Sequence, residues 1–171
     1  MSSLTLAQVN AMPPEAFRAA FGGVFEHSPW IAERAFAARP FASVAALHGA
    51  MSDVVRRASR EEQLALLRAH PDLAGKEARA GTMTRDSASE QGGAGLSALA
   101  RGEMERIDGL NRRYRGKFGF PFIIAVRRHT KDGIFREFER RLENDADTEL
   151  ANGLEQVFLI TRLRLDGMIP G

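Results

Sequence analysis

Residues 69–96 read AHPDLAGKEARAGTMTRDSASEQGGAGL. The stretch places His70 directly before a proline and then groups a hydroxyl, a carboxylate and an amide at Ser87, Glu90 and Gln91. Glycines after the histidine and after the second group allow the chain to bend sharply there. We therefore expect the rest of the chain to pack around this polar stretch.

Outside this stretch, apolar residues recur at the spacing of helices that bury one face. One continuous apolar run, residues 121–126, has no second clear strand to pair with, so we expect an extended buried segment. The pattern predicts an all-α fold, a single-domain compact helical bundle of roughly eight or nine helices, over residues 1–171. The expected helices cover residues 5–12, 13–22, 29–39, 43–55, 59–70, 73–80, 102–118 and 130–144, and a last helix runs from residue 147 or 148 to 168.

Two local signals place the candidate catalytic groups relative to helix ends. Pro71 disfavours helical geometry at His70, so the preceding helix should end there. The dipole of that helix then favours a protonated imidazole, although a lone histidine is often structural. Ser87 and Glu90 have the spacing of a capping box, which is the structural alternative to a functional role.

Composition limits the possible functions. The chain has 171 residues, no cysteine, 24 basic and 22 acidic residues and a net charge of +2. Its arginine doublets fall on separate predicted elements with acids among them, so we expect solvated helix faces and no nucleic-acid partner. No apolar run is long enough for a membrane helix and the first residues do not resemble a secretory signal, so we expect a cytoplasmic protein. The doublets are Arg56-Arg57, Arg112-Arg113, Arg127-Arg128 and Arg140-Arg141.

A metal site is not expected. The sequence offers no thiolate, and its four histidines lack the spacing of metal ligands. His27 is interpreted as a packing or capping residue.

Several motifs together resemble one known family. His70-Pro71-Asp72-Leu73-Ala74-Gly75-Lys76, followed by Ser87-x-x-Glu90-Gln91, is similar to the central motifs of the decarboxylases that act on 2-oxo-4-hydroxy-4-carboxy-5-ureidoimidazoline (OHCU) in urate degradation. The resemblance spans roughly residues 21–168. It also includes Phe25-Glu26-His27-Ser28-Pro29-Trp30, Leu110-Asn111-x-x-Tyr114, Lys117-Phe118-Gly119-Phe120-Pro121-Phe122-Ile123 and Arg164-Leu165.

The resemblance implies a set of site residues. It gives His70 and Glu90 catalytic roles and adds an arginine from the last helix; spacing alone allows Arg162 or Arg164, and the family pattern selects Arg164. Gly119 and Pro121 interrupt regular hydrogen bonding, so peptide groups nearby are candidates to bind a ligand. The implied substrate contacts are Pro71, Ser87, Glu90, Gln91, Phe120, Phe122, Ile123 and Arg164.

The function implied is the cofactor-free decarboxylation of OHCU to (S)-allantoin by a carboxy-lyase, and the family resemblance also suggests a homodimer. Two alternatives remain open from the residues alone. His70 and Glu90 could serve hydrolysis of a related ureide, or they could be helix caps in a non-catalytic helical interaction module.

Overall fold

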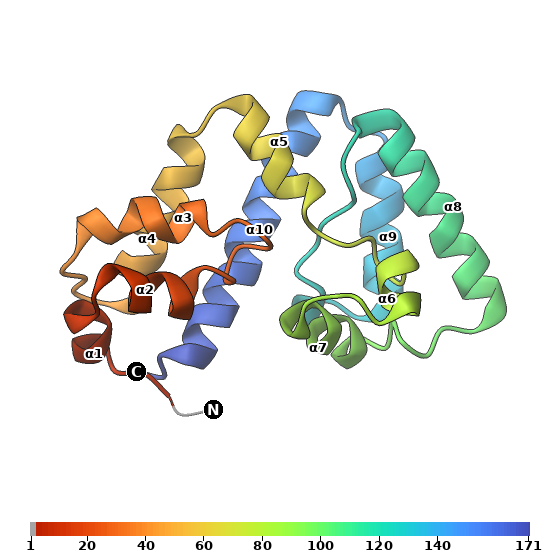
Figure 1. Cartoon of the computed structure of the whole chain (residues 1–171). Coiled ribbons are helices and arrows are strands. Elements are labelled where there is room, and N and C mark those ends of the chain that lie inside the picture. Colours follow the sequence, from red (N-terminus) through yellow and green to blue (C-terminus); the bar gives the residue numbers. More distant parts are fainter. Residues whose placement is uncertain (1–2) are drawn as a thin grey trace. The chain divides into compact units, whose positions relative to one another are not determined.

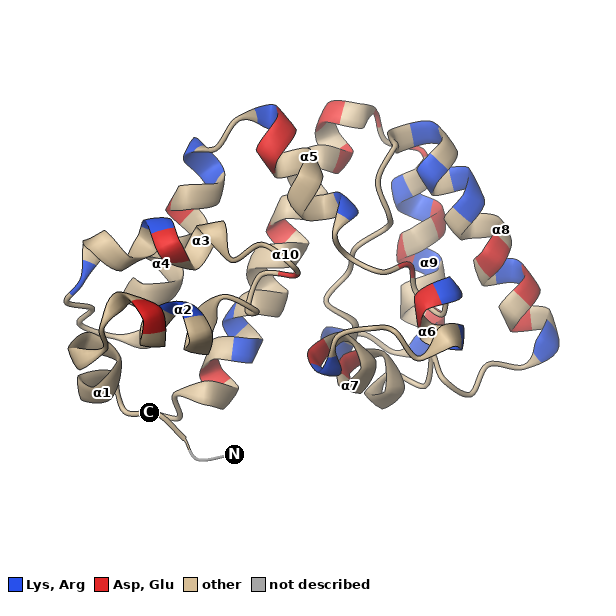
Figure 2. Cartoon of the chain, in the orientation of Figure 1, with Lys and Arg blue, Asp and Glu red and all other residues tan. Residues whose placement is uncertain are grey.

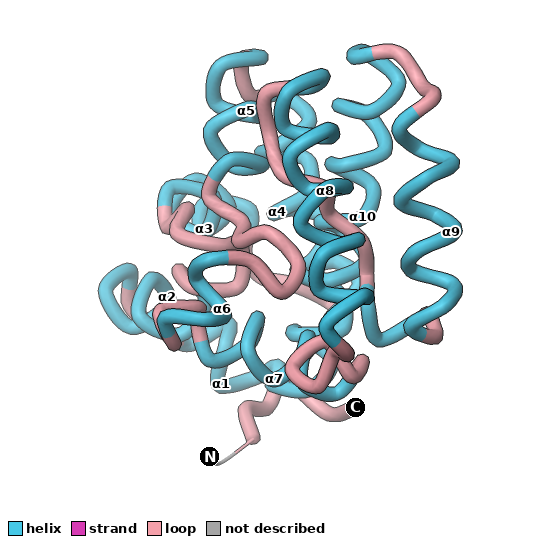
Figure 3. Tube along the Cα trace, turned by 90° about the vertical axis from the view of Figure 1, so that its right-hand side faces the viewer, coloured by secondary structure: helices cyan, strands magenta, loops and turns pink. Residues whose placement is uncertain are grey.

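The computed structural model describes residues 3–171 and contains ten α-helices and two short 3₁₀ helices (Figure 1). No β-strand occurs among these residues, and loops join the helices (Figure 3). The prediction of an all-α fold is therefore confirmed. The helices are α1 (Leu6–Ala11), α2 (Pro14–Phe21), α3 (Trp30–Ala35), η1 (Phe36–Ala38), α4 (Val44–Arg57), α5 (Arg60–Arg68), α6 (Lys76–Ala80), α7 (Arg85–Gly93), α8 (Arg101–Phe118), η2 (Val126–Arg128), α9 (Lys131–Leu142) and α10 (Ala146–Met168).

Side-chain caps define where several helices begin. The Ser43 hydroxyl accepts from the Ala46 amide, and Ser59 forms the predicted capping box with Glu62. Each cap satisfies an amide that the first helical turn would leave without an acceptor. The predicted starts of α4 and α5 are thus confirmed.

Two helix starts were predicted wrongly. The fragment expected from residue 73 begins at Lys76, because residues 73–75 form a turn. The last helix begins at Ala146 and not at residue 147 or 148, since the Asp145 carboxylate accepts from the Thr148 amide at 2.8 Å and caps it.

The chain forms two compact units, one from residues 3–69 with 158–171 and one from residues 70–157. In the first unit, Phe17 lies at the centre of an aromatic core, with its ring centroid 4.9 Å from that of Phe21 and 5.4 Å from that of Phe36. Helix α3 packs against both α2 and α4 there. The expectation of a single domain over the whole chain stays a prediction.

The second unit is built around Tyr114 on α8. Its buried ring contacts four phenylalanines, and Phe122 stacks on Phe138 of α9 with centroids 3.9 Å apart. Helices α8 and α9 pack against each other (Figures 1 and 3). Residues 121–125 cross this core without regular structure, as predicted. The phenylalanines around Tyr114 are Phe118, Phe120, Phe122 and Phe138.

Acidic and basic residues are mixed along α9 and the first half of α8, whereas the second half of α8 carries only basic ones (Figure 2). An example is the ion pair of Arg106 with Glu139, 2.5 Å apart and half-exposed. The prediction that the arginine doublets lie on solvated faces is wrong at one position, because Arg141 is only 2% exposed. No described helix has the length and apolar character needed to cross a membrane.

Candidate active site

His70 follows the end of α5 and opens the second unit. Helix α5 ends at Arg68 and Ala69 closes its last turn, as Pro71 predicts. The histidine lies in a bend and is 6% exposed. We call residues 70–75 the histidine loop.

The backbone of the histidine loop is unusual. Ala74 has a φ of +49°, a left-handed conformation that costs a residue with a β-carbon roughly 1–2 kcal/mol. At Gly75 an added β-carbon would lie 2.6 Å from the β-carbon of Asp72, so only glycine fits without a shift. A strained conformation persists only where the surrounding structure imposes it.

Three side chains impose this conformation. The Gln91 amide oxygen accepts from the Ala74 amide at 2.9 Å, and the Asn111 amide donates to the Leu73 carbonyl at 2.9 Å. The Arg115 guanidinium donates to both carboxylate oxygens of Asp72, at 3.0 and 3.2 Å. Two helices, α7 and α8, thereby hold the loop that begins with the histidine.

Helix α7 carries the second predicted group. Its buried residues, Ser87 and Gln91, are polar, so it has no apolar stripe. Ser87 is 5% exposed, whereas Glu90 is partly exposed. These two residues and Gln91 lie on adjoining faces of one helical turn, as predicted.

The capping-box alternative for Ser87 and Glu90 is wrong. The Thr84 hydroxyl accepts from the Ser87 amide at 3.2 Å, so Thr84 is the cap and Ser87 lies inside the helix. Glu90 therefore lies in the body of α7 and is not part of a capping box with Ser87.

In the structure, Gln91 supports the histidine loop. In addition to the bond to Ala74, its amide nitrogen donates weakly to the Asp72 carbonyl at 3.4 Å. Both ends of the amide thus point at the histidine loop. Direct contact of Gln91 with a substrate stays a prediction.

The predicted aromatic residues lie in the core of the second unit. Phe120 is 2% and Phe122 1% exposed, and both contact the Tyr114 ring. The neighbouring Ile123 is 4% exposed, and its carbonyl accepts from Arg141 at 2.7 Å. Any contact of this segment with a small polar ligand would therefore involve its peptide groups.

The predicted arginine belongs to the first unit. Arg164 is 7% exposed and lies 3.1 Å from the Glu26 carboxylate, which is almost fully buried. It also donates to the Val24 carbonyl at 3.0 Å. The alternative, Arg162, is partly exposed and pairs along the helix with Asp166.

The polar residues that support the histidine loop and the core of the second unit were not predicted from the sequence. Asn111 is 7% exposed and lies between Ile107 and Tyr114 on the apolar stripe of α8. A polar residue at such a position is a signal of a buried polar contact. The same signal applies to Arg141 on α9 and Glu149 on α10, which form a buried ion pair at 2.8 Å.

Burial and hydrogen bonding shift the pKa values of Tyr114 and Glu149. Burial raises the pKa of Tyr114, and its hydrogen bond to Glu149 raises it further. For Glu149, burial opposes ionisation, but hydrogen bonds from Tyr114, Asn144 and Asn152 and the nearby Arg141 charge outweigh it, so the pKa is lowered. The carboxylate is therefore ionised at neutral pH.

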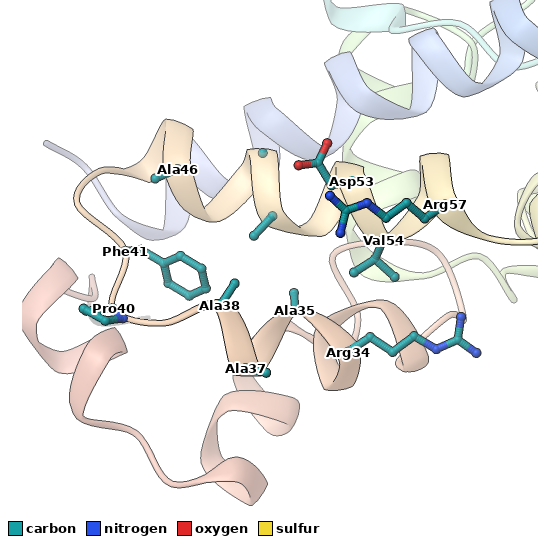
Figure 4. Close-up of a pocket in the computed structure, with 12 residues that line it drawn as sticks. Arg34, Ala35, Ala37, Ala38, Pro40, Phe41, Ala46, Asp53, Val54 and Arg57 are labelled. Atoms are coloured by element: carbon teal, nitrogen blue, oxygen red, sulfur yellow. The ribbon is translucent and has the colours of Figure 1, made fainter.

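The first unit also has an open pocket of about 660 Å³ between α3 with η1 and α4 (Figure 4). Phe41 lies toward one end, while Asp53 and Arg57 lie toward the other. Its walls are mostly alanine and other small apolar side chains, and none of the predicted site residues lines it. Among residues 3–171, no group of three or more metal-ligating side chains converges.

The described geometry defines a helical protein with a buried histidine on a strained, side-chain-held loop beside a polar helix. The family model for OHCU decarboxylase matches residues 10–166. The chain therefore belongs to the OHCU decarboxylase family, which confirms the resemblance seen in the sequence.

Individual relatives agree over nearly the whole chain. An OHCU decarboxylase of Haloferax volcanii is 47% identical over 165 residues and covers 96% of each chain. The mouse protein of the same name is 36% identical over 97% of this chain and 93% of its own. A Bacillus subtilis uric acid degradation bifunctional protein is 42% identical over 96% of this chain but only 33% of its own.

Two solved structures share the fold. A crystal structure of (S)-allantoin synthase superposes with a TM-score of 0.76 at 30% identity, covering 97% of this chain and 54% of that one. A crystal structure of OHCU decarboxylase in the presence of (S)-allantoin gives 0.70 at 21% identity, over 86% of this chain and 96% of that one.

Proposed function

We propose that this protein is a carboxy-lyase that converts OHCU to (S)-allantoin in urate degradation. The observation that carries the proposal is family membership, shown by the match of the family model to residues 10–166. The printed names of relatives and solved structures, which include OHCU decarboxylase, (S)-allantoin synthase and uric acid degradation protein, agree with it.

The chemistry needs no electron acceptor beyond the substrate itself. The carbon that bears the departing carboxylate also bears a hydroxyl and adjoins a ring imine. When the bond to the carboxylate breaks, CO2 leaves and the electron pair moves into the imine. The hydroxyl-bearing carbon is left as part of an enol, which loses its hydroxyl proton and becomes a ring carbonyl. A proton must then be added to one face of the former imine carbon, which bears the ureido group, and this choice of face makes the product chiral.

His70 is proposed as the acid/base group that delivers this proton. Its loop is held by Gln91, Asn111 and Arg115, which would fix the imidazole where the proton is needed. Fixed orientation of this kind is a large source of rate enhancement. At 6% exposure the His70 side chain is itself largely shielded from bulk water.

Glu90 is proposed to orient His70 or to bind the substrate hydroxyl. This role is supported by its place inside α7, where Thr84 does the capping. Ser87 on the same helix, Pro71 and the peptide groups near Phe120, Phe122 and Ile123 are proposed to hold the ring and the ureido group.

Arg164 is proposed as a further substrate contact. We expect Arg164→Ala to raise KM for OHCU more than Arg162→Ala, since Arg162 forms an exposed pair with Asp166. Because Arg164→Ala also leaves buried Glu26 without its ion pair, folding must be checked in parallel. Greater sensitivity at Arg162 would transfer the role to that residue.

The protein is further proposed to act without a cofactor, as a homodimer in the cytoplasm. The absence of cysteine suits a reducing compartment. Light scattering of the purified protein tests the dimer, and a monomer at working concentration would reject it.

A substrate assay separates the proposal from its alternatives. Purified protein is mixed with freshly generated OHCU or with allantoin. Turnover of OHCU supports the decarboxylase, whereas hydrolysis of allantoin would favour a ureide hydrolase. Failure to turn over either compound, with no thermal stabilisation by allantoin, would favour the interaction module.

A further inference from the structure

The extended segment, residues 120–125, has no strand partner among the residues that the structure describes. Side chains hold its backbone instead. The Arg141 guanidinium donates to the Ile123 carbonyl at 2.7 Å, and the Gln156 amide oxygen accepts from the Ala125 amide at 2.9 Å. The conformation of the segment therefore depends on a few buried polar side chains.

Arg141 is itself held by the Glu149 carboxylate, which accepts four hydrogen bonds. Oε1 of Glu149 accepts from the Tyr114 hydroxyl at 2.6 Å and from Nε of Arg141 at 2.8 Å. Its Oε2 accepts from Asn144 at 2.9 Å and from Asn152 at 2.7 Å. The guanidinium also lies 4.4 Å from the centroid of the Phe122 ring, on the same segment.

In the peptide unit between Ile123 and Ile124, the carbonyl is hydrogen-bonded within residues 3–171 and the N–H is not. Its carbonyl accepts from Arg141, while its N–H, on Ile124, has no acceptor among the described residues. Ile124 is 4% exposed, and a buried N–H without an acceptor is rare in folded proteins. In a trans peptide the two groups point in opposite directions, so this N–H faces away from Arg141.

The bond from Arg141 changes the N–H as well as the carbonyl. Hydrogen bonds in a chain polarise one another, more strongly where the surroundings are apolar. A guanidinium at the carbonyl therefore makes the N–H of the same peptide a better donor to an anion. The substrate of the proposed reaction carries a carboxylate.

We propose that Arg141 is a positioning residue for substrate binding, which holds and polarises the Ile123–Ile124 peptide so that the Ile124 N–H binds the anionic substrate. This inference rests on the proposed function. Glu149 keeps Arg141 in place, and neither side chain contacts the substrate. A buried ion pair in the core of the second unit would thus influence how tightly the substrate binds.

The test compares three variants with the wild type in OHCU turnover. Arg141→Met alone would leave the Glu149 charge buried and could fail to fold. The double change Arg141→Met with Glu149→Gln removes both charges, and Arg141→Lys keeps a charge with a smaller reach. Arg140→Met is the matched control, because Arg140 is the exposed neighbour that pairs with Glu137.

We expect the folded double variant to raise KM about tenfold or more with a smaller change in kcat, the scale of one weakened charge-assisted hydrogen bond. Arg141→Lys should raise KM less, and Arg140→Met should change neither constant. A wild-type KM in the folded double variant, or in Arg141→Lys if the double variant does not fold, overturns the inference.

A second measurement needs no variant. In ¹⁵N-labelled wild-type protein, the Ile124 amide resonance should move on addition of allantoate, a ureide that carries a carboxylate, and an unchanged resonance under saturating allantoate also overturns the inference. If wild-type protein does not turn over OHCU at all, it is the proposed function that fails. If it does and these results are negative, only the role of Arg141 fails.

Discussion

Gln91→Leu tests whether the histidine loop is held in place by α7. Leucine fills a similar volume but cannot accept the hydrogen bond from the Ala74 amide, which lies at 2.9 Å in the native protein. Ala74 is 2% exposed, so its amide would be left buried without an acceptor, at a cost of about 1–3 kcal/mol. The bond to Asp72 adds little, because 3.4 Å is long for a hydrogen bond.

These contributions predict a loss of about 2 kcal/mol in the free energy of unfolding. For a chain of this length that corresponds to a fall in Tm of roughly 4–8 °C. The strained φ of Ala74 would then relax and move His70. Since a displacement of about 1 Å can cost about 10²-fold in rate, kcat should fall by up to this factor even in the folded variant.

The assay measures Tm by circular dichroism and kcat with OHCU on the same preparations. Gln91→Glu keeps the acceptor for the Ala74 amide and should lose less stability than Gln91→Leu. Ser89→Ala, at an exposed position on the same helix, is the control and should match the wild type. A Gln91→Leu protein with wild-type Tm and kcat would show that the hydrogen bond from Ala74 to Gln91 does not hold the histidine loop.

Three further changes have defined outcomes. His70→Asn should keep the fold but lose on the order of 10²–10⁴-fold in kcat, because an amide cannot transfer a proton near neutral pH; near-normal turnover would exclude proton transfer by His70. Glu90→Gln should lower kcat and Glu90→Ala should barely change Tm, whereas Thr84→Ala should cost about 1 kcal/mol as the loss of a cap; the reverse order of stabilities would restore the capping role of Glu90. The folded-state pKa of Glu149 is lowered, so its ionised carboxylate contributes fully to stability above the ordinary glutamate pKa. This contribution is lost as the pH falls through the folded-state pKa. In Glu149→Gln the corresponding fall of Tm in acid should be absent, and a Tm that depends on pH as in the wild type would contradict this expectation.

The sequence was sufficient to predict the helices that have both an apolar stripe and a cap. Ser59 with Glu62 marked the start of α5, and Pro71 marked its end. Each of these signals lies within a few residues of its effect, so a single sequence contains it. The histidine at the end of α5 was placed correctly for the same reason.

The supporting contacts could not be predicted in the same way. Asn111 reaches Leu73 across 38 positions of sequence, and Arg115 reaches Asp72 across 43. No local pattern specifies such partners, although a polar residue on an apolar stripe indicates that one exists. Helix α7 gives no apolar periodicity in the sequence, because polar contacts, and not an apolar face, hold its buried side.

The proposed function is tested most directly by following freshly generated OHCU with purified wild-type protein by circular dichroism. OHCU also decays without an enzyme, so loss of substrate alone proves little, and uncatalysed decay gives racemic allantoin. We expect rapid appearance of the S enantiomer, at the same rate in excess EDTA. A racemic product at the uncatalysed rate, or activity lost to the chelator and restored by a divalent ion, would contradict it.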